Sequence, residues 1–406
     1  MAVTEQTVQL SPETVARIQE ELRTQGVDGW LMYNFRGNNP IAGDLLGLPA
    51  LTRRYFAWIP AQGRPVAITH RIEQQPWTGW IGDNWPYSSW QELDSRLAQL
   101  LSGNPRVAME YAPADAVPYV DKVPAGVVEM VRATGAEPVT SGDLVSAFYA
   151  RWSDEGLAGH RRAAKHVYEV AHEAFRRIAA AIREGRETGE WEVRQWIMGE
   201  FARRGITVGG DAIVAVNANA ANPHYAPSAD HHSPIRRDDL VLIDLWGKED
   251  EGAIYADQTW MGYVGESVPQ RLEDIFAAVR DARLAAIDLI RRRWDAGQDV
   301  AGWEADDVSR GVLVDAGWGE QIFHRTGHSI DRELHGSGPN IDNVESKDTR
   351  RLIQGVGFSI EPGIYLSGDV GFRSEVDVYM GPDGPEVTTP EPQTAVYALL
   401  SDPRFA

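Results

Sequence analysis

The chain has 406 residues, 43% of them hydrophobic, and its 59 acidic and 39 basic residues give a formal net charge of −20. A chain of this length exceeds the usual size of one hydrophobic core, so the sequence predicts two domains. The acidic balance, which no basic run offsets, argues against a nucleic-acid partner, and the absence of cysteine excludes disulfides and thiolate metal sites.

No stretch of the sequence is long enough and apolar enough to span a bilayer. The first ten residues, MAVTEQTVQL, lack the basic start and the apolar centre of a signal peptide. We therefore expect a soluble, cytoplasmic protein without a membrane partner.

Residues 1–152 are predicted to form a small α/β domain. Ser11 and Pro12 are typical of a helix start, and Gly26 would end that helix. Strands are predicted at residues 30–33 and in the segments YFAWIP, PVAIT and RVAMEY, with helical segments between them. Several large aromatic residues lie between Arg71 and Gln91, after the PVAIT strand, where they could form local packing or a subunit contact. They are Trp77, Trp80, Trp85, Tyr87 and Trp90.

Residues 153–406 are predicted to form an α+β domain in which helices cover one face of a curved sheet. Ser153 would cap a long helix that ends at Gly185, and a second helix would begin at Thr188. Two further helices are predicted in LEDIFAAVRDARLAAIDLIRRRW and EADDVSRGVLVDAGW.

Two predicted hairpins of this domain carry acids within apolar strands. Asp244 and Asp257 lie 13 residues apart in LVLIDLWGKEDEGAIYADQTW, and Glu361 and Glu375 lie 14 apart in GFSIEPGIYLSGDVGFRSEVDVYM. A carboxylate in such a strand is costly unless a positive charge meets it, and few basic residues are near. The four acids therefore indicate bound cations.

The segment FHRTGHSIDRELHG places His324, His328 and His335 between the two hairpins. Histidine is the commonest side-chain metal ligand and also a proton shuttle. Two divalent ions would balance the four acids, with His328 completing the ligand set. Oxygen-rich sites with one imidazole suit Mn²⁺, with Co²⁺ or Zn²⁺ as alternatives, and paired metals suit hydrolysis.

The ordered motifs NPHYAP, IDLWG, YADQT, RTGHSI, SIEPGIY and FRSEVDV resemble those of the M24 family of metallopeptidases, which includes creatinase and methionine aminopeptidase. The resemblance covers about residues 155–400 and is greatest to the Xaa-Pro branch, which holds prolidases and aminopeptidases P. It implies a catalytic domain with the pita-bread fold and a homodimeric protein.

The resemblance also implies roles for the ligands. Asp257 and Glu375 would bridge two metal ions, Asp244 would bind one ion, and His328 and Glu361 would bind the other. Glu361 would in addition be the base that takes a proton from the attacking water.

Further residues receive roles around this centre. His224 and His335 would contact the substrate and stabilise the oxyanion, and His324 is either a substrate contact or a structural residue. Arg373, two residues before Glu375, could hold a ligand carboxylate from behind the metals.

Two features bear on the substrate. The sequence between His328 and His335 departs from the glycine-rich run that most family members have there: residues 329–333 are Ser, Ile, Asp, Arg and Glu, which could reshape the substrate wall. Arg36, in the loop NFRGNNP of the first domain, could bind the free carboxylate of a dipeptide, or it could be an ordinary surface arginine.

The sequence thus predicts a prolidase, a metal-dependent enzyme that hydrolyses Xaa-Pro dipeptides. The alternative within the family is an aminopeptidase P, which acts on longer peptides. Alternatives of other kinds are a metal-free, creatinase-like amidinohydrolase and a peptide-binding module without catalysis.

Overall fold

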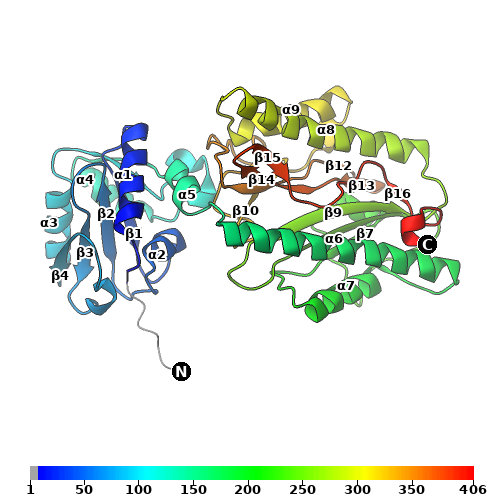
Figure 1. Cartoon of the computed structure of the whole chain (residues 1–406), viewed down its shortest axis with the longest axis horizontal. Coiled ribbons are helices and arrows are strands. Elements are labelled where there is room, and N and C mark those ends of the chain that lie inside the picture. Colours follow the sequence, from blue (N-terminus) through cyan, green and yellow to red (C-terminus); the bar gives the residue numbers. More distant parts are fainter. Residues whose placement is uncertain (1–7) are drawn as a thin grey trace. The chain divides into compact units, whose positions relative to one another are not determined.

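The computed structural model describes residues 8–406 (Figure 1) and divides the chain into two compact units, one ending at Tyr149 and one spanning Ala150–Ala406. We propose that these units are the two predicted domains. Among residues 8–406, no helix combines the length and the apolarity needed to cross a membrane.

The N-terminal unit is built on a six-stranded sheet in the order β4-β3-β2-β1-β5-β6. Its strands are β1 (Gly29–Asn34), β2 (Tyr55–Pro60), β3 (Val66–His70), β4 (Asp83–Tyr87), β5 (Arg106–Met109) and β6 (Glu137–Thr140). Strand β2 runs antiparallel to β1 and β3, and the other pairs are parallel. The predicted α/β character of this part is confirmed.

Both faces of this sheet are apolar because successive side chains alternate between them. Trp30 and Met32 of β1 pack with α1, α2 and α5, whereas Leu31 and Tyr33 pack with α3 and α4. These helices are α1 (Pro12–Gln25), α2 (Pro40–Leu46), α3 (Trp90–Leu100), α4 (Ala125–Ala133) and α5 (Gly142–Phe148).

The predicted first helix is confirmed as α1. The Ser11 hydroxyl accepts a hydrogen bond from the Thr14 backbone N–H at 3.1 Å, and Gly26 ends the helix in the left-handed region at φ 64°.

Local packing explains part of the aromatic segment that follows β3. The Trp77 ring is buried and lies 5.1 Å from the Tyr55 ring and 5.7 Å from the Trp80 ring. Trp90, by contrast, is 64% exposed. Whether Trp90 contacts another subunit stays a prediction.

The C-terminal unit places its strands between two pairs of helices (Figure 1). The helices are α6 (Asp154–Arg183), α7 (Glu190–Arg204), α8 (Gln270–Asp295) and α9 (Gly302–Asp315). Helices α6 and α7 pack on a four-stranded sheet in the order β16-β9-β8-β7, and α8 and α9 pack on the strands that follow. The strands of the first sheet are β7 (Ile213–Val216), β8 (Leu240–Gly247), β9 (Ala256–Tyr263) and β16 (Tyr397–Ala398).

The second half of this unit holds another four-stranded sheet, in the order β10-β11-β14-β15, and a separate hairpin of β12 and β13. These strands are β10 (Ser329–Ile330), β11 (Gly357–Ile360), β12 (Gly363–Leu366), β13 (Val370–Arg373), β14 (Val376–Gly381) and β15 (Gly384–Val387). The predicted α+β class is confirmed, although the strands form two sheets and a hairpin where one curved sheet was expected.

The two acidic hairpins differ in outcome. The first is confirmed, since β8 and β9 pair with Asp244 opposite Thr259. In the second, the expectation that each acid lies inside a strand is wrong. Glu361 lies between β11 and β12, and Glu375 lies between β13 and β14. Pro362, which has no N–H for a strand ladder, follows Glu361 at the break.

Candidate metal centre

Three buried side chains of the C-terminal unit converge with the spacing of metal ligands. Asp257, His328 and Glu375 each offer a ligand atom, and these atoms lie within 4.8 Å of one another. The His328 Nε2 atom is 3.5 Å from Asp257 Oδ2 and 3.5 Å from Glu361 Oε1. The cluster therefore joins residues that are far apart in the chain.

The strand pairings explain why the four acids meet. Asp257 and Thr259 share one face of β9, and Thr259 lies opposite Asp244 on β8, so both aspartates project from the same face of the pair. The other face packs on α6. Strands β11 and β14 pair Ile360 with Val376, which places the adjoining Glu361 and Glu375 side by side at the strand ends.

Backbone pairing sets His328 beside Glu361. The Glu361 N–H donates to the Thr326 carbonyl at 2.6 Å, and the Ser359 N–H donates to the His328 carbonyl at 2.8 Å. Gly327 permits this approach, because a Cβ atom there would lie 2.0 Å from the Ser359 carbonyl oxygen. The Nδ1–H of His328 donates to the Ser329 carbonyl at 3.1 Å, which leaves Nε2 directed at the acids.

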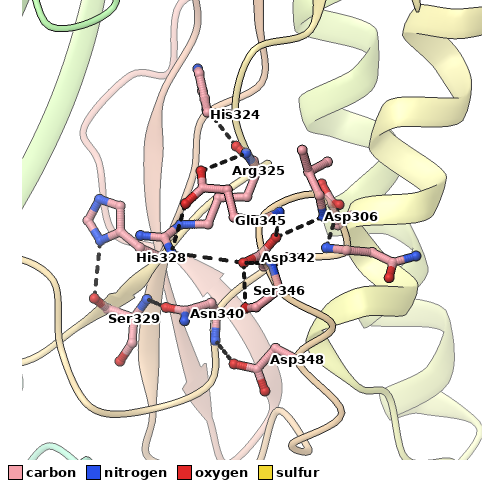
Figure 2. Close-up of polar contacts among 12 residues, drawn as sticks. Asp306, His324, Arg325, His328, Ser329, Asn340, Asp342, Glu345, Ser346 and Asp348 are labelled. Atoms are coloured by element: carbon pink, nitrogen blue, oxygen red, sulfur yellow. Dashed lines mark hydrogen bonds and ion pairs between the residues drawn. The ribbon is translucent and has the colours of Figure 1, made fainter. Parts of the chain in front are cut away.

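A loop behind the histidine segment holds it in place (Figure 2). In this loop, Asn340 Oδ1 accepts a hydrogen bond from the Ser329 N–H at 2.9 Å. On helix α9, Asp306 Oδ1 accepts one from the Thr326 N–H at 2.9 Å. The loop itself turns around the buried Asp342 carboxylate, which accepts hydrogen bonds from the N–H groups of residues 344, 345 and 346. Fixed backbone on both sides thus limits the motion of His328.

The electrostatics of the centre call for a cation. Burial, followed by repulsion from neighbouring carboxylates, holds the pKa of Asp257 and that of Glu375 well above their usual ranges. Burial likewise raises the pKa of Asp244. Asp257 Oδ1 is buried and has no hydrogen-bond partner among residues 8–406. Divalent ions would remove this repulsion and satisfy the unpaired oxygen, so the residues present fit a metal site.

Arg373 is a buried cation at the edge of the cluster. It forms an ion pair with Asp244, and its Nε–H donates to the Thr259 hydroxyl at 2.8 Å. The same Nε lies 3.8 Å from Glu361 and 4.0 Å from Glu375. Asp244 is therefore adjacent to the three clustered ligands and oriented by an arginine.

The histidines differ in their surroundings. The His335 ring centroid lies 4.5 Å from that of His328, and the His335 residue is exposed. Partial burial lowers the pKa of His335 to about 4. The charges of His328, Arg325 and His224 lower this pKa further, whereas the charge of Glu361 raises it. His224 is exposed as well.

His324 is bound on both ring nitrogens. Its Nδ1–H donates to the Arg325 carbonyl at 2.6 Å, and its Nε2 accepts a hydrogen bond from the Tyr365 hydroxyl at 2.7 Å. Arg36 belongs to the N-terminal unit, where it is exposed and its guanidinium lies 5.5 Å from the Phe35 ring.

The sequence reading missed Asp377, a fully buried acid two residues after Glu375. Its Oδ2 accepts a hydrogen bond from the Asp257 N–H at 2.9 Å, and burial raises the pKa of Asp377 to about 8. In the sequence FRSEVDVYM this acid stands two positions after Glu375 in an apolar segment, and that spacing could have identified it.

The chain is similar to known peptidases. The model of metallopeptidase family M24 matches residues 162–382. The Xaa-Pro dipeptidase of Lactobacillus delbrueckii subsp. lactis is 36% identical over 165 residues, 41% of this chain and 40% of that protein. The chain thus matches less than half the length of that relative.

Two mycobacterial proteins match over more of their length. The probable dipeptidase PepE of Mycobacterium tuberculosis is 27% identical over 331 residues, 80% of each chain. The crystal structure of dipeptidase PepE from Mycobacterium ulcerans covers 95% of this chain and 96% of that chain with a TM-score of 0.68 and 21% identity. The structural likeness shows that the two chains share a fold.

Proposed function

Since the chain belongs to metallopeptidase family M24, we propose that it is a divalent-metal-dependent prolidase, which hydrolyses the peptide bond before proline in Xaa-Pro dipeptides. The observation that carries the proposal is the buried cluster of Asp257, His328 and Glu375, with Asp244 and Glu361 beside it. Similarity to an Xaa-Pro dipeptidase supports the choice of substrate.

These five residues would hold two divalent ions, with Mn²⁺ as the preferred metal and Co²⁺ or Zn²⁺ as substitutes. Four carboxylates match the charge of two such ions, and an oxygen-rich set with one imidazole suits Mn²⁺. The ions, when bound, would polarise the scissile carbonyl and acidify the attacking water. Asp257 and Glu375 are the acids proposed to be shared, and both lie within the cluster.

The protein groups around the ions manage protons and orientation. Glu361, with Oε1 3.5 Å from His328 Nε2, is the carboxylate that we propose accepts the proton of the attacking water. His224 and His335 would donate hydrogen bonds to the developing oxyanion and would help the proton that Glu361 takes from the water to reach the leaving nitrogen. Their exposed rings support this role, because a substrate can reach them.

Two other predicted residues, His324 and Arg373, would hold neighbouring groups in place. Two roles were predicted for His324, a substrate contact and a structural residue. Its hydrogen bonds to Arg325 and Tyr365 support the structural role. The ion pair of Arg373 with Asp244 supports a role in holding that ligand. Homodimer formation and a cytoplasmic location remain expectations from the sequence.

A panel of Xaa-Pro dipeptides and Xaa-Pro-Xaa tripeptides, assayed with Mn²⁺, Co²⁺ and Zn²⁺, tests the substrate. We expect dipeptides to have the higher kcat/KM. An Arg36→Ala variant should lower kcat/KM for dipeptides by about 10–100-fold, because a hydrogen bond to a charged group contributes about 1.5–3 kcal/mol. Arg64→Ala, another exposed arginine of the N-terminal unit, is the matched control. A preference for tripeptides would instead identify an aminopeptidase P.

A further inference from the structure

Glu190, the first residue of α7, has a fully buried carboxylate that accepts four short hydrogen bonds. Its Oε1 accepts from the Val216 N–H at 2.7 Å and from Asn219 Nδ2 at 2.8 Å. Its Oε2 accepts from the Tyr225 hydroxyl at 2.6 Å and from the Ser233 N–H at 2.6 Å. A carboxylate accepts about four hydrogen bonds, so the capacity of Glu190 is filled.

The four donors surround His224 in the chain. They lie between residues 216 and 233, a segment that leaves β7 (Ile213–Val216), forms the short helix η4 (Asn217–Ala221) and returns to α7. Glu190 therefore binds both ends of this segment and two points within it. The residue directly after His224 is Tyr225, which is buried and gives its hydroxyl to Glu190.

His224 has only weak local support of its own. It is exposed, and its backbone N–H donates to Asn222 Oδ1 at 3.3 Å. The position of the His224 imidazole therefore depends on the path of the backbone through Tyr225. That path is set by a charged acceptor, and charge-assisted hydrogen bonds are about twice as strong as neutral ones.

The charge of Glu190 is stabilised without a basic side chain. Among residues 8–406 no ion pair involves Glu190, and its place in the first turn of α7 puts the carboxylate at the positive end of the helix dipole. Gly189, the residue before it, provides no side-chain cap. The donors of the 216–233 segment and the helix terminus together balance this charge.

We propose that Glu190 is a positioning residue for His224. The buried carboxylate fixes the 216–233 segment and thereby holds the His224 imidazole in the position from which it would contact the substrate. Glu190 does not touch the substrate in this arrangement. The inference rests on the role proposed above for His224 in peptide hydrolysis.

The test compares Glu190→Gln and Tyr225→Phe, each in the wild-type and in the His224→Ala background. In the wild-type background we expect kcat to fall about 10-fold for Tyr225→Phe and about 100-fold for Glu190→Gln, because a displacement of about 1 Å can cost 10²-fold. KM and the affinity for Mn²⁺ should each stay within about twofold of the wild-type value, because losing an interaction made only in the transition state lowers kcat and leaves KM unchanged. In the His224→Ala background neither change should lower kcat further, because residues that act through one another are non-additive.

Equal losses in both backgrounds, or no loss in the wild-type background, would overturn the proposal. Tyr225→Phe removes one hydroxyl and decides the question if Glu190→Gln does not fold. Ser228→Ala, an exposed position of the same segment, is the matched control and should leave kcat unchanged.

Hydrogen–deuterium exchange separates this inference from the proposed function. We expect faster amide exchange in residues 216–233 of both variants and unchanged exchange in Ser228→Ala. If the wild-type protein cleaved no Xaa-Pro peptide, or if His224→Ala kept full kcat, the proposed function or the role of His224 would fail instead. Unchanged exchange in Tyr225→Phe and Glu190→Gln would show that Glu190 does not hold the segment.

Discussion

Replacing Asp257 with asparagine is expected to lower the rate of Xaa-Pro hydrolysis by on the order of 10⁴-fold, the scale seen when one member of a catalytic unit is removed. Asp257 lies within the cluster of three ligands, and its Oδ2 is 3.5 Å from His328 Nε2. Asparagine keeps the shape of the side chain but removes the charge that would bind a divalent ion. Steady-state kinetics and elemental analysis of the same sample measure both losses.

When metal is absent, the same substitution should raise the thermal stability of the protein. Because burial and neighbouring acids raise the pKa of Asp257 above its unfolded value, its ionised form destabilises the chelated protein above that unfolded pKa. Asparagine removes this cost, so the chelated variant should melt above chelated wild type at pH 7, by about 2–4 °C for each kcal/mol recovered. The difference should shrink as the pH falls toward the unfolded pKa.

Asp250→Asn is the matched control for both measurements. Asp250 lies in the exposed turn that joins β8 and β9, where its Oδ1 accepts a hydrogen bond from the Gly252 N–H at 2.8 Å. We expect Asp250→Asn to change neither hydrolysis nor metal content. An Asp257→Asn protein that hydrolyses at the wild-type rate would remove Asp257 from the centre.

The second large effect is expected for Arg373→Met, which should destabilise the chelated protein by about 3–5 kcal/mol, the usual result of leaving a buried charge without its partner. Arg373 is buried, forms an ion pair with Asp244 and donates to the Thr259 hydroxyl at 2.8 Å. Methionine fills the space but leaves the Asp244 carboxylate without its cation. Thermal and denaturant unfolding in the presence of a chelator measure the change.

Arg283→Met provides a matched control in the same unit. Arg283 is also buried, but it donates to neutral acceptors, the Ser374 hydroxyl at 2.5 Å and the Gln393 carbonyl at 3.0 Å. Burial lowers the pKa of Arg283 to about 10. Its removal leaves no carboxylate unpaired, so the expected loss is about 1–3 kcal/mol. Equal losses of stability for both variants would show that the ion pair with Asp244 contributes no more than the neutral hydrogen bonds of Arg283.

The sequence predicted the parts of the centre that depend on local pattern. Asp244 and Asp257 stand out because each interrupts an apolar strand, and the structure places both strands where they were expected. The motif around His328 is equally local. These residues could be found because the polar exceptions are visible against a strong hydrophobic pattern.

Other features depend on contacts between distant residues. The breaks at Glu361 and Glu375 arise because β11 pairs with β14 while β12 and β13 form their own hairpin. The hydrogen bond between His324 and Tyr365 joins residues 41 apart. The four bonds of Glu190 likewise reach residues 26 to 43 positions away. No local pattern predicts such pairs.

The most direct measurement of the central claim is a metal titration of stripped protein. The chelated chain is supplied with increasing Mn²⁺, and bound metal and hydrolysis of an Ala-Pro dipeptide are measured on the same samples. We expect no hydrolysis without metal and full activity at about two ions per chain. Hydrolysis that persists after complete chelation, or a chain that binds Mn²⁺ no better than the Asp257→Asn variant, would contradict a metal centre built from these five side chains.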